Sequence, residues 1–570
     1  MPPADGSAHL EPFQTACCGH VASARARLAR SAIWRMALYR DISYASCSAE
    51  MRRLAMRRPD LVTLSTTQAL YGLPTAGECR DPSGVRAPCH NFVLEITNRT
   101  SLHEHKERPE VLILGALHGD ERVGPATALA LGQWLVLRYD RDPWVRRLVD
   151  TRTILVMPMP NAIGVELATR DELGVDPNRD FPYDQHPSKC MATVTARSIN
   201  EVYRARLLQL VITFHGGMQA IGYNWGAFPY YHGRPRRSPD DVSQREIASQ
   251  MSRFAGSGNV RGNRPYPTST MNDLVYPVHG GLEDWGYGAS WDTAYVKPCT
   301  PRSYGGYPAS RSSSYPDAAA RAYTVLVETS DVKGPPARTF GGEDGVYAPG
   351  SSTDGHVPRN VRLALAGIDL VAPSVVARIA ASPSDNRGAG SDEGLAADAV
   401  RAGACVALEW VVWGAVRVEG SSPMCRQPPA TEWTACGDSQ SGDGVWGGSS
   451  SPFRPFTFRG CARVPESAAG LLELAVSATV DTTWARAPVG RPYSPENSQP
   501  QSHLARARAD GYAASNNGHT VHGHTAWLSE PLQVHVGASG SDASTESETL
   551  AERGSRSNRS LRLLRRRWSA

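Results

Sequence analysis

Three residues that can bind a metal stand at the ends of apolar segments of the sequence. His118 and Glu121 lie three residues apart, just after the apolar run "EVLILGAL", and His215 ends a second run, "LQLVITFH". A lone histidine in such a place is more often a hydrogen-bonded structural residue, but Glu328 ends a third run, "TVLVE". Two imidazoles and one carboxylate are a common ligand set of catalytic zinc and leave a fourth position for water. The joint pattern therefore indicates a catalytic zinc site.

The segments that must position these residues alternate between strands and helices. Short runs rich in Val, Ile and Leu cover residues 91–97, 110–119, 151–161, 208–217 and 322–330. Residues 124–149 form a segment long enough for a crossover helix. This alternation predicts an α/β fold with a mixed, mostly parallel sheet flanked by helices. Ligands of such sheets bind beyond the carboxyl ends of the strands, which is where the histidines and the glutamates stand.

The composition changes outside this α/β region. Residues 336–360 are rich in Gly, Pro and Ser and indicate a linker, and residues 360–381 are typical of a helix. From about residue 403 the apolar segments are short and rich in Val, Thr and Trp, as in a small β-sandwich. The expected organisation has five parts: a basic, disordered leader at 1–40, a catalytic α/β domain at 41–335, a linker and helix at 336–402, a β-sandwich at 403–540 and a disordered basic tail at 541–570.

Charge and hydropathy argue against two classes of function. The net charge of +4 is small for 570 residues, and basic residues gather in the two terminal segments, so nucleic acid binding is not expected. No segment is long and apolar enough to span a membrane, and no continuous apolar core follows the early arginines as it would in a signal peptide. The sequence alone does not define an oligomeric state.

The eleven cysteines include no C-x-x-C pair, so a cysteine-bound zinc is not expected. Cys79 and Cys89 are close enough to close a small loop, and four more cysteines gather between residues 405 and 461. This usage suggests an oxidising compartment, and Asn98 stands in the glycosylation sequon "NRT". The odd count leaves at least one thiol free or paired between chains.

Five motifs resemble those of zinc metallocarboxypeptidases of the funnelin type: "HGDE", "GVDPNRDFPYD", "TFHGG", "GGLEDWGY" and "VETS", in this order. The fourth is similar to the regulatory branch, which carries a small transthyretin-like β-sandwich after the catalytic domain. The resemblance covers roughly residues 40–335. It implies one zinc ion and a hydrolase that removes the C-terminal residue of peptides or proteins. It also favours the secretory pathway or the extracellular space, with the cytoplasm as the alternative.

The resemblance implies a role for each residue of the metal centre. His118, Glu121 and His215 match the zinc ligands. Asp176 matches the carboxylate that orients the first histidine by accepting its second N–H. Glu328 matches the general base, which takes a proton from the attacking water and returns it to the leaving amine.

The resemblance also assigns four residues to the substrate. Asn178 and Arg179 match the pair that binds the terminal carboxylate, to which a guanidinium offers two parallel hydrogen bonds. Tyr287 matches the tyrosine that closes over the substrate. Arg170 lies close to the position of the oxyanion-stabilising arginine, although its spacing to Asn178 is one residue shorter than usual in the regulatory branch.

The pocket for the substrate's last side chain departs from the regulatory branch. In that branch the stretch after "HGG" contains an aspartate that pairs with a C-terminal Lys or Arg. When Tyr223 is aligned with the family tyrosine, Gly226 takes the place of that aspartate, beside Trp225. A desolvated cation needs a partner, so the sequence predicts no strong preference for C-terminal Lys or Arg. The alternative is that Glu283 or Asp284, in "GGLEDWGY", supplies the charge.

Two other functions fit the same motifs. One is a deacylase or amidohydrolase on the same scaffold, which need not retain the region around Tyr287. The other is a non-catalytic, carboxypeptidase-like binding protein, because some members of the family lose zinc ligands or the base and keep the fold. This chain retains all of those residues, which favours the enzyme.

Overall fold

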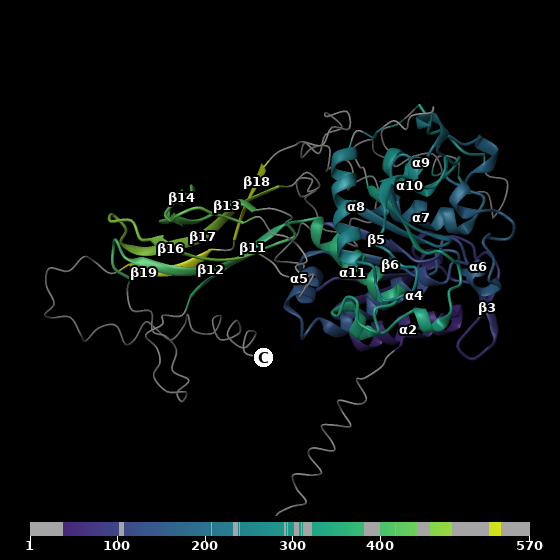
Figure 1. Ribbon diagram of the computed structural model, residues 1–570, viewed down its shortest axis with the longest axis horizontal. Helices are drawn as coiled ribbons and strands as arrows, with labels where there is room; N and C mark the ends of the chain where they lie inside the picture. The colour runs from purple at the N-terminus through teal and green to yellow at the C-terminus, as the bar shows by residue number, and fades with distance from the viewer. Residues whose placement is uncertain are drawn as a thin grey trace, which may run out of the picture.

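The computed structural model places the chain around two main hydrophobic cores (Figure 1). The first core gathers buried residues between Tyr44 and Val371, and the second gathers those between Val375 and Val536. The structure describes residues 38–101, 108–206, 208–231, 237–238, 240–289, 292, 294–300, 307–308, 311, 322–380, 400–415, 418–442, 456–481, 524–529 and 531–536. The expected leader and tail, at 1–40 and 541–570, lie almost entirely outside these residues.

The first core surrounds an eight-stranded sheet. In spatial order its strands are β1 (Val62–Thr66), β4 (Phe92–Ile96), β6 (Thr153–Met157), β5 (Glu110–Leu114), β7 (Leu208–His215), β10 (Tyr323–Ser330), β8 (Met218–Tyr223) and β9 (Thr268–Thr270). The four central strands, β6, β5, β7 and β10, are parallel to one another. Strands β4 and β8 flank them in the antiparallel sense. The predicted mixed, mostly parallel sheet is therefore confirmed.

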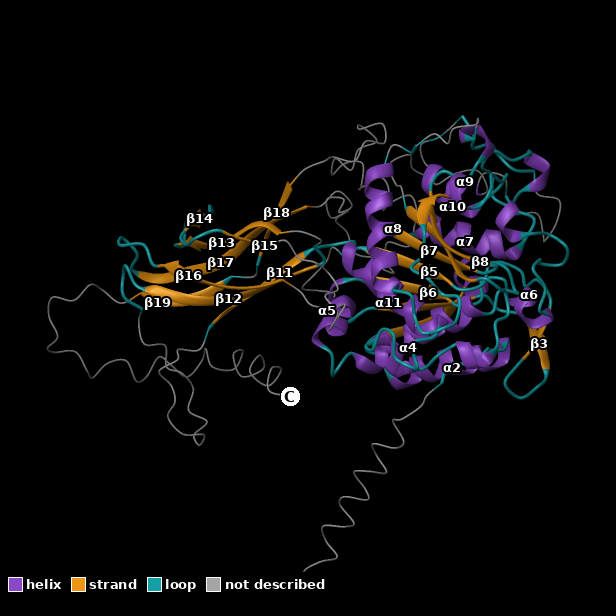
Figure 2. Ribbon diagram, in the orientation of Figure 1, coloured by secondary structure: helices purple, strands orange, loops and turns teal. Residues whose placement is uncertain are grey.

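Helices cover both faces of this sheet (Figure 2). They include α2 (Tyr44–Arg57), α4 (Val123–Arg138), α5 (Pro143–Thr151), α7 (Val194–Ala205), α8 (Asp241–Ala255) and α10 (Leu282–Gly288). Helix α4 is buried around most of its circumference, as expected of a crossover helix pressed between a sheet and other helices. The segment predicted as one crossover helix divides into α4 and α5, because Asp142 caps the second helix and Pro143 occupies its first turn.

The segment expected as a linker and helix is divided between the two cores. Helix α11 (His356–Leu370) is buried along its length and packs against α4 and α8, so it belongs with the first sheet. Residues 374–379, expected as part of the helix, form strand β11 (Ser374–Ile379) instead. Pro373 separates the two elements, and the Val-rich segment after it favours an extended chain. The packing of the first core therefore continues past residue 335 to Val371, and the second core begins at Val375.

The second core lies between two antiparallel sheets, which form a small β-sandwich (green to yellow in Figure 1). One sheet contains β11, β12 (Cys405–Trp413) and β16 (Phe456–Arg463). The other contains β14 (Thr434–Ala435), β13 (Val418–Arg426), β17 (Gly470–Asp481) and β18 (His524–Leu528), with β15 (Gln440–Gly442) and β19 (Leu532–Val536) paired to β13 and β17. The alternation of buried and exposed residues along β12 is the pattern of a strand with one face in a core.

Four disulfides connect eight of the nine described cysteines. The predicted small loop is closed by Cys79–Cys89. The late cysteines pair within the sandwich as Cys405–Cys461 and Cys425–Cys436. The fourth bridge, Cys190–Cys299, joins two loops of the α/β unit and was not predicted. Among the described cysteines, Cys47 is a free thiol and is buried.

The sequon asparagine, Asn98, is only 8% exposed. Its amide nitrogen donates hydrogen bonds to the Tyr139 hydroxyl and to an Asp150 carboxylate oxygen. The folded protein therefore does not present this amide to a glycosylating enzyme, and the sequon gives no support for secretion. Within the described part of the chain, no helix combines the length and the apolar character needed to cross a membrane.

Candidate active site

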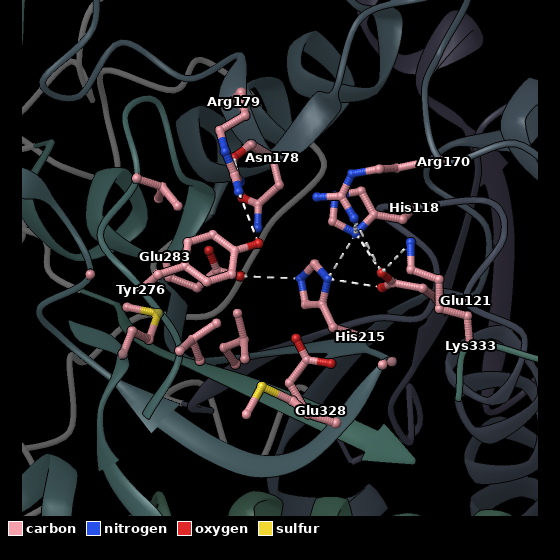
Figure 3. Close-up of a pocket in the computed structure, with 18 of the residues that line it drawn as sticks. His118, Glu121, Arg170, Asn178, Arg179, His215, Tyr276, Glu283, Glu328 and Lys333 are labelled. Carbon is pink, nitrogen blue, oxygen red and sulfur yellow. Dashed lines mark hydrogen bonds and ion pairs between the residues drawn. The ribbon is translucent and has the colours of Figure 1, made fainter. Parts of the chain in front are cut away.

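The pocket lies at the carboxyl ends of the central strands (Figure 3). His118 and Glu121 stand in the turn between β5 and α4, and His215 is the last residue of β7. Gly119, between the first two, packs so closely on helix α6 (Ala162–Leu167) that a Cβ would lie 2.0 Å from the carbonyl carbon of Gly164. Only glycine allows the turn to approach that helix, which explains the glycine in "HGDE".

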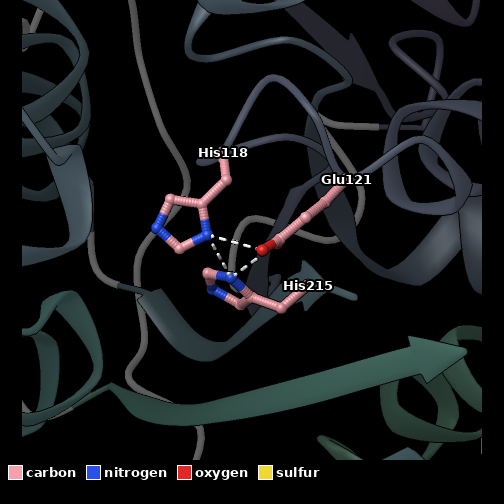
Figure 4. A group of neighbouring side chains, drawn as sticks. All are labelled: His118, Glu121 and His215. Carbon is pink, nitrogen blue, oxygen red and sulfur yellow. Dashed lines mark hydrogen bonds and ion pairs between the residues drawn. The ribbon is translucent and has the colours of Figure 1, made fainter. Parts of the chain in front are cut away.

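The side chains of His118, Glu121 and His215 converge on one point (Figure 4). The Nδ1 of His118 lies 2.9 Å from Glu121 Oε1 and 3.2 Å from the Nδ1 of His215. The Nδ1 of His215 lies 3.1 Å from the other Glu121 oxygen. All three side chains are buried, and their ligand atoms lie within 4.8 Å of one another. The group has the donor types and the spacing of a metal-binding triad.

The outward nitrogen of each imidazole faces a carboxylate. His118 Nε2 lies 3.0 Å from Asp176 Oδ1, as predicted, and His215 Nε2 lies 3.4 Å from Glu283 Oε1, which was not predicted. When each Nε2–H donates to its carboxylate, both Nδ1 lone pairs point inward at the Glu121 carboxylate. Lone pairs so close together repel unless a proton or a metal cation lies between them. The residues present therefore fit a bound divalent metal ion.

The electrostatics of His215 agree with this interpretation. Burial lowers the pKa of the imidazole, but hydrogen bonds and charge from Glu121 and Glu283 outweigh burial and raise it to about 10. The surroundings of His215 thus favour a positive charge at this place, and a divalent cation satisfies that preference.

Glu328 stands in β10 at the side of the triad and lines the same pocket. Burial raises the pKa of its carboxyl to about 7; His215 opposes the increase and Glu121 adds to it. Its Oε2 atom is buried and has no hydrogen-bond partner among the described residues. A carboxylate with a free oxygen beside a metal triad is placed to accept a proton from a water molecule.

Arg170 lies on the other side of the triad, in the loop after α6. Its Nε donates to Asp176 Oδ2 at 2.9 Å, and its Nη1 lies 3.4 Å from Glu121 Oε1 and 3.2 Å from His118 Nδ1. Asp176 therefore holds both His118 and Arg170. The structure brings this arginine to the edge of the metal site, where the sequence alignment placed it despite the shorter spacing.

Asn178 and Arg179 form one wall of the pocket, at a short 3-10 turn that the Asp176 side chain caps. Asn178 is buried, and its Oδ1 accepts a hydrogen bond from the backbone N–H of Leu282 at 2.8 Å. Arg179 Nη1 donates to the Asn178 carbonyl, and its Nη2 lies 3.4 Å from the Tyr276 hydroxyl. The guanidinium, the amide and a phenol thus face the same space.

The structure places Tyr287, the tyrosine assigned from the sequence, away from the pocket. Tyr287 is fully buried, its hydroxyl donates to Asp240 Oδ2 at 2.6 Å, and its ring packs edge-on against Trp225. It is absent from the pocket lining, whereas Tyr276 is part of it and is 55% exposed. Tyr276 lies two residues beyond helix α9 (Met271–Leu274), on a loop, so strand or helix periodicity gave no signal for it.

The part of the pocket that would receive the substrate's last side chain also differs from the expectation. Gly226 lines the pocket as predicted, but Trp225 stacks on Tyr230 outside it, with 4.2 Å between ring centroids. Both Glu283 and Asp284, the alternative sources of charge that the sequence left open, line the same pocket. Asp284 accepts hydrogen bonds from the Gly226 N–H with both carboxylate oxygens. Burial raises the pKa of Asp284 to about 7, although these hydrogen bonds oppose the increase.

Comparisons with known proteins agree with the geometry. Residues 90–310 match the family model described as zinc carboxypeptidase, a segment that ends before Glu328. "Carboxypeptidase SOL1" of Arabidopsis thaliana is 28% identical over 205 residues, which are 34% of this chain and 40% of that protein. "Carboxypeptidase D" of Rattus norvegicus is 28% identical over 255 residues, which are 42% of this chain and 17% of that protein. The family resemblance predicted from the motifs is confirmed.

Among solved structures, a carboxypeptidase A from Helicoverpa armigera is 15% identical, with a TM-score of 0.38. The matched region makes up 61% of this chain and 79% of the Helicoverpa armigera chain. The chain spans less than half the length of the two curated relatives named above.

Proposed function

We propose that this protein is a zinc metallocarboxypeptidase. The premise is the match of residues 90–310 to the zinc carboxypeptidase family model. It would hydrolyse the last peptide bond of peptides or proteins that have a free C-terminus. One observation carries the proposal: the His118, Glu121 and His215 triad shares a pocket with the Arg179 guanidinium, which forms no ion pair with a carboxylate of the described residues. A metal triad performs hydrolysis, and the guanidinium selects the chain end.

His118, Glu121 and His215 would hold the zinc ion, with Asp176 and Glu283 fixing the two imidazole rings. When bound, zinc supplies Lewis acidity that polarises the scissile carbonyl and acidifies the attacking water. The two outer carboxylates keep the proton on each Nε2, which leaves each Nδ1 free to act as a ligand.

Glu328 would act as the general base. Its free carboxylate oxygen accepts a proton as water oxygen bonds to the carbonyl carbon. The same group then gives this proton to the amine nitrogen as the carbon–nitrogen bond breaks. A pKa near 7 suits both steps, because the group must accept and release a proton under the same conditions.

Arg170 would stabilise the oxyanion that forms on the former carbonyl oxygen. Its guanidinium is already oriented by Asp176 and lies at the edge of the metal triad. A fixed positive charge at the place where negative charge develops lowers the barrier without further reorganisation.

Asn178, Arg179 and Tyr276 would bind the terminal carboxylate. A guanidinium offers two parallel N–H donors to a carboxylate, and the amide and the phenol add further donors. Substrates without a free carboxylate would leave the Arg179 charge without a partner. This arrangement supports removal of one residue at a time.

The pocket for the last side chain has apolar walls that include Met271 and Leu326, and it contains the Glu283 carboxylate. The aliphatic stem of a Lys or Arg fits such walls, and its charged head needs a carboxylate partner. Glu283, with Asp284 beside it in the pocket lining, would supply the charge that is missing at Gly226. We therefore propose a preference for basic C-terminal residues.

The disulfides of the protein indicate the compartment in which it would act. Four disulfides favour an oxidising compartment, and we propose the secretory pathway or the extracellular space. Its partners would be the C-termini of peptides or proteins.

The test is an assay of the zinc-loaded protein on two matched hexapeptides, one with a free C-terminus and one amidated, followed by mass spectrometry. Stepwise loss of single residues from the free-acid peptide alone, abolished by a zinc chelator, is the expected result. Release of an acyl group from an acylated amino acid without peptide cleavage would favour a deacylase. Peptide binding without any product would favour a non-catalytic protein.

A further inference from the structure

The loop that follows β10 carries a lysine into the pocket, and the proposed function assigns it no role. The Ser330 carbonyl accepts a hydrogen bond from the Gly217 N–H, and the Lys333 carbonyl accepts one from the Arg122 N–H, both within 2.9 Å. Lys333 passes over two glycines: a Cβ on Gly216 would lie 3.6 Å from its Cα. The backbone is thus fixed on both sides, and the side chain is directed along the pocket wall.

The ammonium of Lys333 lies between two carboxylates. Its Nζ is 2.9 Å from Asp120 Oδ2 and 3.5 Å from Glu121 Oε1, and the side chain is 37% exposed. The other Asp120 oxygen is buried and has no hydrogen-bond partner among the described residues. An ammonium has three N–H donors, so one donor remains for a group that enters the pocket.

The position of Lys333 relative to Arg179 indicates which part of a bound peptide lies near this free N–H donor. Figure 3 shows the two cations on opposite sides of the triad formed by His118, Glu121 and His215. A peptide whose terminal carboxylate reaches Arg179 places its last peptide bond at the triad. The residue before that bond, the penultimate residue, must then lie towards Lys333.

We propose that Lys333, held by Asp120, forms the subsite for the penultimate residue and makes the protein favour an acidic side chain there over a basic one. This inference rests on the proposed function and adds a second element of specificity to it. The carboxylate of a penultimate Asp or Glu receives the free N–H donor, whereas a penultimate Lys or Arg meets a like charge. Because Lys333 is partly exposed, the preference is moderate.

The experiment compares hexapeptides that differ only in the penultimate residue, Glu, Gln or Lys, and share the same last residue. The zinc-loaded protein should cleave the Glu peptide with a kcat/KM about fivefold above that of the Lys peptide. A ratio of this size corresponds to the free energy of one ion pair at a partly exposed site. Lys333→Met should bring the ratio to about one, and Lys333→Arg should retain it. Lys189→Met, at an exposed lysine outside the pocket lining, is the matched control and should leave the ratio unchanged.

Binding provides a readout that does not need turnover. Calorimetric titration of the Glu328→Gln variant with the same peptides should give the same order of affinities. An equal preference for Glu and Lys peptides in both measurements, or a preference that survives Lys333→Met, would overturn the proposal. Failure of the proposed function has another signature: no cleavage of any peptide, whatever its penultimate residue.

Discussion

Glu328 lies directly opposite His215 in the parallel register of β10 and β7. Partners at one register position of adjacent strands direct their side chains to the same face of the sheet. The sheet itself thus sets a carboxylate beside a proposed metal ligand, and neither side chain depends on a loop for its place. This rigid pairing is the basis of the first prediction.

Glu328→Gln should abolish most turnover and leave the fold and the zinc content intact. Glutamine has the shape of glutamate but cannot accept the proton of the attacking water. We expect kcat to fall by about 100- to 10,000-fold, the range that general-base catalysis contributes. Kinetics of the zinc-loaded variant, with metal content measured on the same sample, provide the check. Near-normal hydrolysis would rule out Glu328 as the base.

The wild type should hold one zinc ion per chain. His215→Ala should lose most of this zinc. Loss of a direct ligand should weaken binding by more than about 100-fold, since loss of an outer hydrogen-bond partner alone costs up to that amount. Elemental analysis after dialysis against a weak chelator measures the occupancy. His535→Ala, on an exposed face of the β-sandwich, is the control histidine. Full zinc occupancy in the His215 variant contradicts the ligand assignment.

Arg179→Met should remove the protein's discrimination between free-acid and amidated peptides. Charged hydrogen bonds to the terminal carboxylate contribute about 1.5–3 kcal/mol, so kcat/KM for the free-acid peptide should fall by about 10- to 100-fold. The already slow cleavage of the amide should change little. Arg179→Lys keeps the charge and should recover part of the loss. Equal cleavage of acid and amide by the wild type would point to an endopeptidase or a deacylase.

Glu283→Gln should reduce the preference for a basic last residue. The amide oxygen of glutamine can still accept the Nε2–H of His215, so zinc should remain while the charge is lost. We expect the ratio of kcat/KM for peptides ending in Arg and in Leu to fall about tenfold, the value of one charged hydrogen bond. A wild-type enzyme that cleaves Arg, Leu and Phe peptides equally would instead support the prediction made from Gly226 alone.

Stability should fall as the pH drops from about 6.5 to about 4, because of His356. Burial, assisted by Arg359, lowers the pKa of this imidazole to about 4 in the folded chain. The ordinary pKa of histidine, 6.5, applies to the unfolded chain. Between pH 6.5 and pH 4 the unfolded chain therefore binds a proton that the folded chain does not, so protonation favours unfolding. We expect His356 to contribute a loss of about 2 kcal/mol between pH 7 and pH 5. Urea unfolding of His356→Gln should show a smaller loss than the wild type.

The convergence of His118, Glu121, His215 and Glu328 on one pocket could be predicted from the sequence because strands determine where they lie. Parallel strands bring their carboxyl ends to one edge of the sheet, so the places of His215, which ends β7, and Glu328, near the end of β10, follow from the apolar runs that precede them. The parallel sheet was predictable for the same reason, since its central strands are buried on both faces and read as continuous apolar runs.

The residues that the sequence did not reveal lie on loops and short helices. Tyr276 and Tyr287 stand in one short stretch, and only the path of the chain decides that the first reaches the pocket and the second packs on Trp225. The contact of Glu283 with His215 joins a helix to a strand, and no spacing in the sequence encodes it. Strand β11 was missed because its Val-rich segment directly follows a helix and only Pro373 marks the change.

The order of the strands has a consequence for the cell that makes this protein. The triad comes from β5 and β7, but Glu328 arrives with β10, after a long stretch of chain has been added, and β10 must insert between β7 and β8 to complete the sheet. A nascent chain that has not yet delivered β10 would have the proposed metal ligands but not the proposed base. If the proposed function holds, the chain would become able to hydrolyse peptides only after β10 has completed the eight-stranded sheet.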